Sequence, residues 1–148
     1  MTVLVVGASG ATGSQLVEQL LIEKHSVKVI VRSPEKLPES WTTNDDLQII
    51  SASLLELSDT EMIAIVSNCD AVASCLGHNL TLKGIYGQPR KLVTDATRRL
   101  CDAIKSNNLQ SPTKFVLMNT TGNRNRDLNE PISFAQKCVI GLLHLFLP

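Results

Sequence analysis

Residues 3–13 read VLVVGASGATG, a short aliphatic run followed by a loop with three glycines. No polar residue interrupts the run, which is typical of a strand buried on both faces of a parallel sheet. Leucine and valine then recur at helical spacing over residues 11–23. The order of strand, glycine loop and helix is the one that a pyrophosphate-binding turn requires.

Each glycine of this loop would have a separate geometric role. Gly7 would allow the tight turn, Gly10 would let the backbone approach a phosphate, and Gly13 would let the helix pack close to the sheet. Free N–H groups at the helix start favour an anion, and the hydroxyls of Ser9 and Thr12 add donors beside it. The alternative is a glycine-rich turn that binds no ligand.

The second apolar run, residues 27–31, ends at a cation. NAD-preferring sites usually carry an acid at this place, where it binds the ribose 2′-hydroxyl. This chain has Arg32 followed by Ser33, and a guanidinium can pair with a 2′-phosphate and stack on adenine. We therefore predict NADP(H) as the cofactor rather than NAD. The alternative is that Arg32 is a solvated cation at a strand end.

Strand-like and helix-like segments alternate along the rest of the chain, which predicts a parallel sheet with right-handed crossovers. Further strands are predicted at residues 27–31, 47–50, 71–75 and 115–118, and further helices at residues 58–67, 88–106 and 132–146. We expect an α/β fold, a Rossmann-type three-layer sandwich with strand order 3-2-1-4-5, as a single domain over residues 1–148. Ligands are expected where the strand order reverses, and Ser58 is expected to cap its helix.

Composition argues against several classes of function. The 148 residues include 14 Lys and Arg and 14 Asp and Glu, and 3% are aromatic, so no nucleic-acid partner is expected. Four cysteines without a CxxC pair make a metal site unexpected. The apolar ending, residues 138–148, is too short to span a bilayer, and the chain does not begin like a secretory signal. A cytoplasmic protein without a membrane partner is therefore expected.

Segments spread over most of the chain share one resemblance. They are GASGATG at residues 7–13, VRSPEK at 31–36, DAVASCLG at 70–77, KLVTDAT at 91–97 and KFVLMNTTG at 114–122. Together they resemble the atypical branch of the short-chain dehydrogenase/reductase superfamily, in particular the NmrA-like and biliverdin/flavin-reductase-like proteins. The resemblance extends to about Gly122 and implies a Rossmann domain that binds a nicotinamide dinucleotide.

The resemblance also implies a role for residues at the strand ends. The pyrophosphate would be held by Gly7, Ser9, Gly10, Ala11, Thr12 and Gly13. The 2′-phosphate would be held by Arg32, and the adenine would lie against Ser53 and Leu54. The ribose and nicotinamide would pass Cys75, Leu76 and Gly77, and the reacting face would be lined by Asn119 and Thr120.

Three departures from the family pattern bear on the chemistry. Gly-Asp-Leu often follows the third strand of relatives, but Ala52-Ser53-Leu54 stands here, so the hydroxyl of Ser53 would replace a carboxylate contact to adenine. Serine often ends the fifth strand, where Thr120 keeps a hydroxyl. The Tyr-x-x-x-Lys pair is missing, because Tyr86 is the single tyrosine and has no lysine four residues later. Thr120 is therefore the candidate catalytic donor, with water or the substrate as alternative proton sources.

Two functions are compatible with these residues. The first is an NADPH-dependent reductase that transfers hydride to a small carbonyl, flavin-like or tetrapyrrole-like acceptor. The second is a non-catalytic NADP(H)-sensing or partner-binding protein, which the missing Tyr/Lys pair favours. The apolar ending is compatible with a C-terminally truncated chain, or with a homo-oligomer formed through that segment.

Two other groups have a structural interpretation. Arg90, Lys91, Arg98 and Arg99 are expected on a solvated helix face. Cys75 is expected to be a small buried residue at a strand end rather than a reactive thiol.

Overall fold

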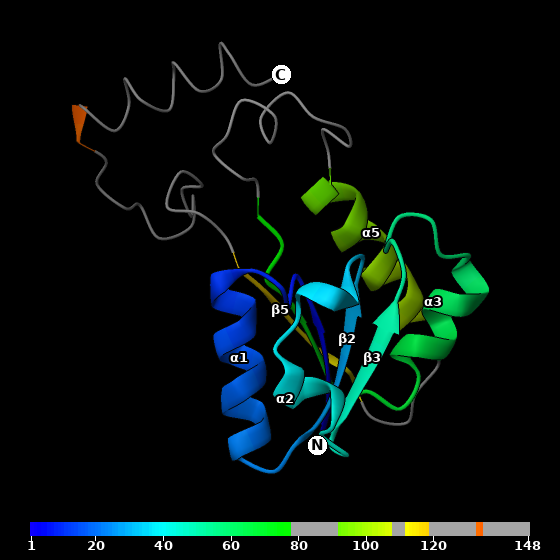
Figure 1. Ribbon diagram of the computed structural model, residues 1–148. Helices are drawn as coiled ribbons and strands as arrows, with labels where there is room; N and C mark the ends of the chain where they lie inside the picture. Colours follow the sequence, from blue (N-terminus) through cyan, green and yellow to red (C-terminus); the bar gives the residue numbers. More distant parts are fainter. Residues whose placement is uncertain (78–91, 108–111, 119–132, 135–148) are drawn as a thin grey trace. The chain divides into compact units, whose positions relative to one another are not determined.

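The computed structural model describes residues 1–77, 92–107, 112–118 and 133–134 (Figure 1). The chain divides into two units, Met1–Met118 and Asn119–Pro148. Only residues 133–134 of the second unit are described, so every element below belongs to the first unit. The prediction of one domain over the whole chain is therefore untested, and the predicted C-terminal helix lies almost wholly outside the described residues.

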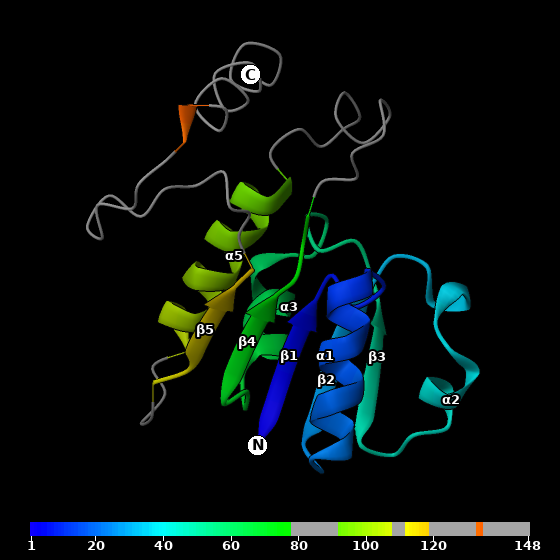
Figure 2. The same ribbon diagram turned by 90° about the vertical axis from the view of Figure 1, so that its left-hand side faces the viewer.

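Five parallel strands form one sheet in the order β3-β2-β1-β4-β5 (Figure 2). They are β1 (Thr2–Val6), β2 (Ser26–Val31), β3 (Leu47–Ser51), β4 (Ala71–Ser74) and β5 (Lys114–Leu117). The register places Val6 at the end of β1 beside Ile30 of β2 and beside Ser74 of β4, so the carboxyl ends of these strands meet at one edge. The predicted Rossmann-type strand order is confirmed, and each predicted strand lies within one residue of its observed bounds.

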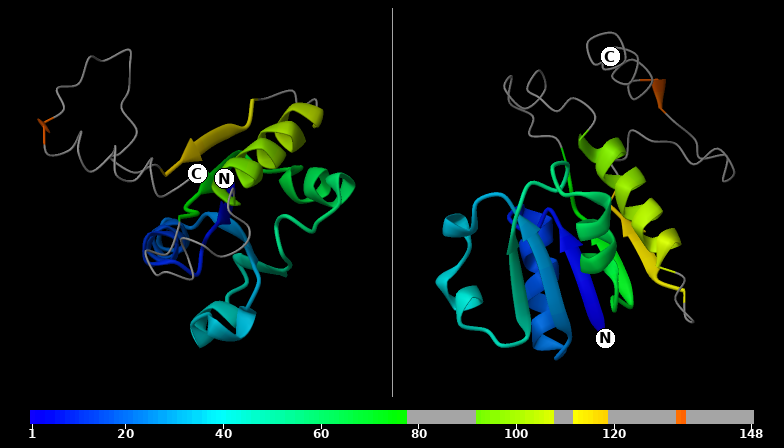
Figure 3. Two further views of the ribbon diagram at one scale, coloured as in Figure 1. Left: turned by 90° about the horizontal axis from the view of Figure 1, so that it is seen from above. Right: turned by 90° about the vertical axis from the view of Figure 1, so that its right-hand side faces the viewer.

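Helices cover both faces of the sheet (Figure 3). They are α1 (Ala11–Ile22), the short α2 (Glu39–Thr42), α3 (Asp59–Val66) and α5 (Leu92–Ser106). Alternate side chains of β1 face opposite layers: Val5 packs in one cluster with Val17 of α1, and Leu4 packs in the other with Leu100 of α5. These side chains are fully buried. The predicted three-layer sandwich is thereby confirmed.

A reciprocal capping box begins α3, with Ser58 as the predicted cap. The hydroxyl of Ser58 accepts the backbone N–H of Glu61 at 3.2 Å, and the Glu61 carboxylate accepts the backbone N–H of Ser58 at 2.7 Å. The same carboxylate also accepts the Ser58 hydroxyl at 2.7 Å. These bonds favour the ionised carboxylate, so they lower the pKa of Glu61 below its usual 4.5. The local sequence is therefore sufficient to start this helix.

The stretch between β2 and β3 contains two short helical turns that the periodicity did not predict, the 3₁₀ turn η1 (Pro34–Lys36) and α2. A proline stands at the beginning of each helical turn: Pro34 opens η1, and Pro38 precedes α2. Trp41 of α2 is 3% exposed and belongs to the cluster on the α1 face of the sheet. A helix of four residues is not stable by itself, so burial of this ring stabilises it.

Candidate functional site

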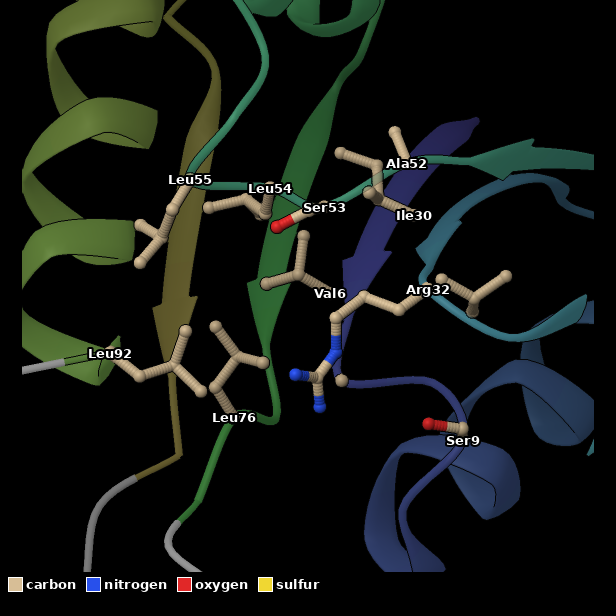
Figure 4. Close-up of a pocket in the computed structure, with 12 residues that line it drawn as sticks. Val6, Ser9, Ile30, Arg32, Ala52, Ser53, Leu54, Leu55, Leu76 and Leu92 are labelled. Atoms are coloured by element: carbon tan, nitrogen blue, oxygen red, sulfur yellow. The ribbon is translucent and has the colours of Figure 1, made fainter. Parts of the chain in front are cut away.

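An open pocket lies at the carboxyl edge of the sheet, where the strand order reverses between β1 and β4 (Figure 4). Its empty space, including the open mouth, is about 590 Å³. Its walls come from the ends of β1 and β2, the loop after β3, the residue after Cys75, and the first residue of α5. This is the place where the strand order predicted a ligand.

The pocket brings together part of the predicted cofactor site. Six predicted residues line it: Gly7, Ser9, Arg32, Ser53, Leu54 and Leu76. Four others belong to the adjoining loop and the first turn of α1: Gly10, Ala11, Thr12 and Gly13. Three follow strand ends without lining the pocket: Ser33, Cys75 and Gly77. Asn119 and the catalytic candidate Thr120 lie outside the described residues.

The glycine loop is packed so closely that two of its positions exclude a side chain. Gly7 has a φ of +80°, and a Cβ on it would lie 2.6 Å from the carbonyl carbon of Cys75. A Cβ on Gly13 would lie 2.2 Å from the carbonyl oxygen of Gly7. Gly10 has more room, since its Cβ would lie 3.3 Å from that same oxygen. The loop therefore brings β1, the end of β4 and the start of α1 into direct backbone contact.

The start of α1 presents unused backbone donors. Its N-cap is Gly10, so no side chain caps the helix, and the first turn holds no acidic residue. Within the described part of the chain, the N–H groups of Ala11, Thr12 and Gly13 have no acceptor. Such a helix start carries a partial positive charge and binds anions. It fits a pyrophosphate, because the bare glycine loop beside it leaves room for close approach.

Among the described residues that line the pocket, Arg32 is the one that carries a charge. Its side chain is exposed, and in Figure 4 the guanidinium points into the space between Ser9 and Leu76. It makes no ion pair or hydrogen bond with the described residues. An exposed cation is what the solvated-cation interpretation expected, but this one stands in a pocket where no described lining residue is a carboxylate. The arrangement favours a ligand that carries negative charge at the end of β2.

The described side chains of the pocket beyond Arg32 are apolar apart from one hydroxyl, that of Ser53 (Figure 4). The remaining wall residues were not predicted from the sequence: Val6, Ile30, Val31, Ala52, Leu55 and Leu92. Apolar residues at strand and helix ends carry no signal that separates a pocket wall from a core position. An apolar slot with a single donor and acceptor fits a planar base.

Cys75 is half-buried and packs against the cluster on the α1 face. Burial raises the pKa of its thiol above the usual 9.0, which favours the protonated form. This agrees with the structural interpretation of Cys75 as a small packed residue.

Residues 7–138 match the model of a family described as NAD(P)H-binding. The chain belongs to this family. The match, together with the fold, confirms the resemblance to the atypical short-chain dehydrogenase/reductase proteins. An Arabidopsis thaliana protein described as uncharacterized and chloroplastic is 34% identical over 118 residues, which are 80% of this chain and 40% of that protein.

Solved structures of the same fold are similar over most of the chain. A yeast methylglyoxal/isovaleraldehyde reductase complexed with NADPH has a TM-score of 0.65 and 20% identity, over 82% of this chain and 38% of that one. A UDP-glucuronic acid 4-epimerase from Bacillus cereus, complexed with UDP-glucuronic acid and NAD, has a TM-score of 0.68 and 21% identity, over 99% of this chain and 52% of that one. At these identities the likeness shows the fold alone, and the chain spans about half or less of these proteins.

Among the described residues, no helix combines the length and the apolar character that crossing a membrane requires.

Proposed function

We propose that the protein binds NADP(H) and is an NADPH-dependent reductase that transfers hydride to a small carbonyl, flavin-like or tetrapyrrole-like acceptor. Membership of the NAD(P)H-binding family supports a nicotinamide dinucleotide. The observation that carries the choice of NADP(H) is the guanidinium of Arg32 at the end of β2, which has no partner among the described residues and stands in a pocket whose described lining holds no carboxylate. An acid at this place would bind the ribose 2′-hydroxyl of NAD, whereas a guanidinium pairs with a 2′-phosphate.

Different residues of the pocket would bind different parts of the dinucleotide. The unused N–H groups of the first turn of α1 would hold the pyrophosphate, with the hydroxyls of Ser9 and Thr12 beside them. Arg32 would hold the 2′-phosphate, and the apolar slot with Ser53 would take the adenine. The bound nicotinamide supplies the hydride. The binding groups position it, and Thr120 is proposed to donate a hydrogen bond to the acceptor.

A non-catalytic NADP(H)-sensing or partner-binding protein is the second candidate. The absence of a Tyr-x-x-x-Lys pair from the sequence favours it, because that pair moves the proton in typical enzymes. A cytoplasmic location and a homo-oligomer formed through residues 138–148 belong to either proposal, and both await a measurement. The chloroplastic location of the Arabidopsis relative is a property of that protein.

Titration calorimetry with NADP⁺ and NAD⁺ tests the choice of cofactor. The unaltered protein should bind NADP⁺ more tightly. Arg32→Asp should weaken NADP⁺ binding by about a hundredfold or more and change NAD⁺ binding little, since it replaces an ion pair with a repulsion. Arg98→Asp is the matched control, because Arg98 is an exposed arginine away from the pocket. An equal loss of affinity for both dinucleotides in Arg32→Asp would contradict the assignment of the 2′-phosphate.

NADPH oxidation across a panel of quinones, flavins and aldehydes tests the reductase proposal. Oxidation that is slowed by Thr120→Val but not by the neighbouring Thr121→Val would support a reductase with Thr120 as donor. Tight NADPH binding without oxidation of any acceptor would instead support the sensing protein. A partner whose affinity depends on the NADP⁺/NADPH ratio would then be expected.

A further inference from the structure

Arg99 of α5 does not lie on the solvated helix face that the sequence predicted. Its side chain is 20% exposed, against 66% for the neighbouring Arg98, which pairs with Asp95 in solvent. Nη1 of Arg99 donates to the carbonyl oxygen of Leu54 at 2.8 Å, and Nη2 donates to the carbonyl oxygen of Leu57. Nη2 also donates to the carboxylate of Asp59 at 3.2 Å. One guanidinium therefore holds two carbonyl oxygens in the segment that joins β3 to α3 and a carboxylate on the first residue of α3.

This segment is a wall of the cofactor pocket. Residues 52–55 line the pocket, and the side chain of Leu54 is 8% exposed. The segment is tied to β2 at its start, where the N–H of Ala52 donates to the carbonyl oxygen of Val31 at 3.0 Å. Beyond that point it folds on itself, with the carbonyl oxygen of Ser53 accepting the N–H groups of the residues three and four positions later. Arg99 supplies the remaining attachment, at the carbonyl oxygen of Leu54 itself.

The same helix forms the neighbouring wall of the pocket. Leu92, the first residue of α5, lines the pocket and precedes Arg99 by two helical turns, so the two residues lie on the same face of α5. In Figure 4, Leu92 on α5 and Leu54 and Leu55 on the loop border the same side of the pocket. A link between α5 and the loop therefore sets the width of the slot between them.

We propose that Arg99 is a positioning residue for the base-binding half of the pocket, and that it sets the affinity for the adenosine portion of NADP(H) without touching the cofactor. The inference rests on the proposed function. An arginine suits this task because its planar fork reaches two carbonyl oxygens and a carboxylate from two separate nitrogens, whereas a lysine offers all its donors from one nitrogen. Without it, the partly buried carbonyl groups of Leu54 and Leu57 lose their partner, and the loop gains freedom to move.

Binding of NADPH and of 2′,5′-ADP to Arg99→Gln tests the proposal, because 2′,5′-ADP is the adenosine half alone. We expect both dissociation constants to rise by about tenfold, the equivalent of one charged hydrogen bond. Arg99→Lys should lie between this variant and the unaltered protein, since an ammonium keeps only part of the contact. Amide hydrogen exchange over residues 52–57 should become faster in Arg99→Gln, in the absence of any ligand.

Two controls separate positioning from a general loss of stability. Arg98→Gln removes an equal charge from the solvent face of the same helix. Asn107→Ala removes a hydrogen bond of 3.2 Å from the residue that follows α5 to the carbonyl oxygen of Ile63 on α3, away from the pocket. Both should bind NADPH and 2′,5′-ADP as the unaltered protein does. Asn107→Ala also measures any change in affinity that comes only from a weaker contact between α3 and α5.

Unchanged affinity in Arg99→Gln, or a loss no larger than that of Asn107→Ala at equal stability, would overturn the proposal. If Arg99→Gln does not fold, the affinity of Arg99→Lys decides in the same way. Failure of the unaltered protein to bind either ligand would refute the proposed function, and with it the base for this inference. If instead the unaltered protein and Arg99→Gln both bind normally, only the role of Arg99 is refuted, and the proposed function stands.

Discussion

Substitution of Gly13 by alanine tests whether the start of α1 needs a bare backbone. A Cβ on Gly13 would lie 2.2 Å from the carbonyl oxygen of Gly7 and 2.8 Å from its carbonyl carbon, whereas ordinary van der Waals contact begins at 3.4 Å. The helix or the loop would therefore have to move by about 1 Å. In an exposed helix the same change is favourable by about 1 kcal/mol, because alanine loses less backbone entropy than glycine.

The steric effect is the larger of the two. Overpacking of a close-packed interior costs about 1–3 kcal/mol, and the upper end applies here because the neighbouring atoms are backbone that cannot rotate away. After the gain in helix propensity, we expect Gly13→Ala to lower the free energy of unfolding by about 2 kcal/mol. The shift also moves the N–H groups of the first turn, so the dissociation constant of NADPH should rise by about tenfold or more.

Urea denaturation and NADPH titration measure these effects. Trp41 is the chain's single tryptophan and is 3% exposed, which makes its fluorescence a reporter of unfolding. Gly10→Ala is the control, because its Cβ would lie 3.3 Å from the same oxygen, and we expect a loss of less than about 1 kcal/mol. A Gly13→Ala protein that is as stable as the unaltered chain, or that binds NADPH as tightly, would refute this account of the loop.

Three further changes test the packing and the titrating groups. Lys28→Met removes two hydrogen bonds of 3.1 and 3.2 Å, to the carbonyl oxygens of Ile65 in α3 and of its C-cap Ser67; it should lower the free energy of unfolding by about 2 kcal/mol in urea, and an unchanged midpoint would contradict this. Hydrogen bonds from Ser58 lower the pKa of Glu61, so their stabilisation is present above its usual 4.5 and is lost as the pH falls below it. Glu61→Gln should therefore flatten the acid side of the stability profile, and a profile that overlays that of the unaltered protein would argue against the capping box. Burial raises the pKa of the Cys69 thiol, so stability should decline as the pH rises past the usual 9.0, and Cys69→Ala should remove this alkaline decline in unfolding curves measured across that range.

Signals that depend on neighbouring residues predicted much of this fold correctly. Unbroken aliphatic runs marked the buried strands, because a strand covered on both faces has no polar side. Ser58 was predicted as the cap of α3, and its partner in the observed capping box, Glu61, is only three residues away. By contrast, α2 has no periodic pattern, and it exists because Trp41 packs on a sheet whose strands are distant in the chain. Burial in the tertiary structure therefore determines that α2 forms.

The candidate site shows the same division. The sequence alone determined the glycine loop, the helix start beside it and the cation after β2, because each depends on residues that adjoin in the chain. Only the tertiary structure decided which distant side chains enclose the slot beyond Arg32, and that Arg99 reaches a carbonyl oxygen 45 residues away. Arg98 and Arg99 are indistinguishable by composition, but one residue of helix turns a side chain by about 100°. That rotation sends one arginine into solvent and the other to the loop, and its outcome depends on how α5 packs against the sheet.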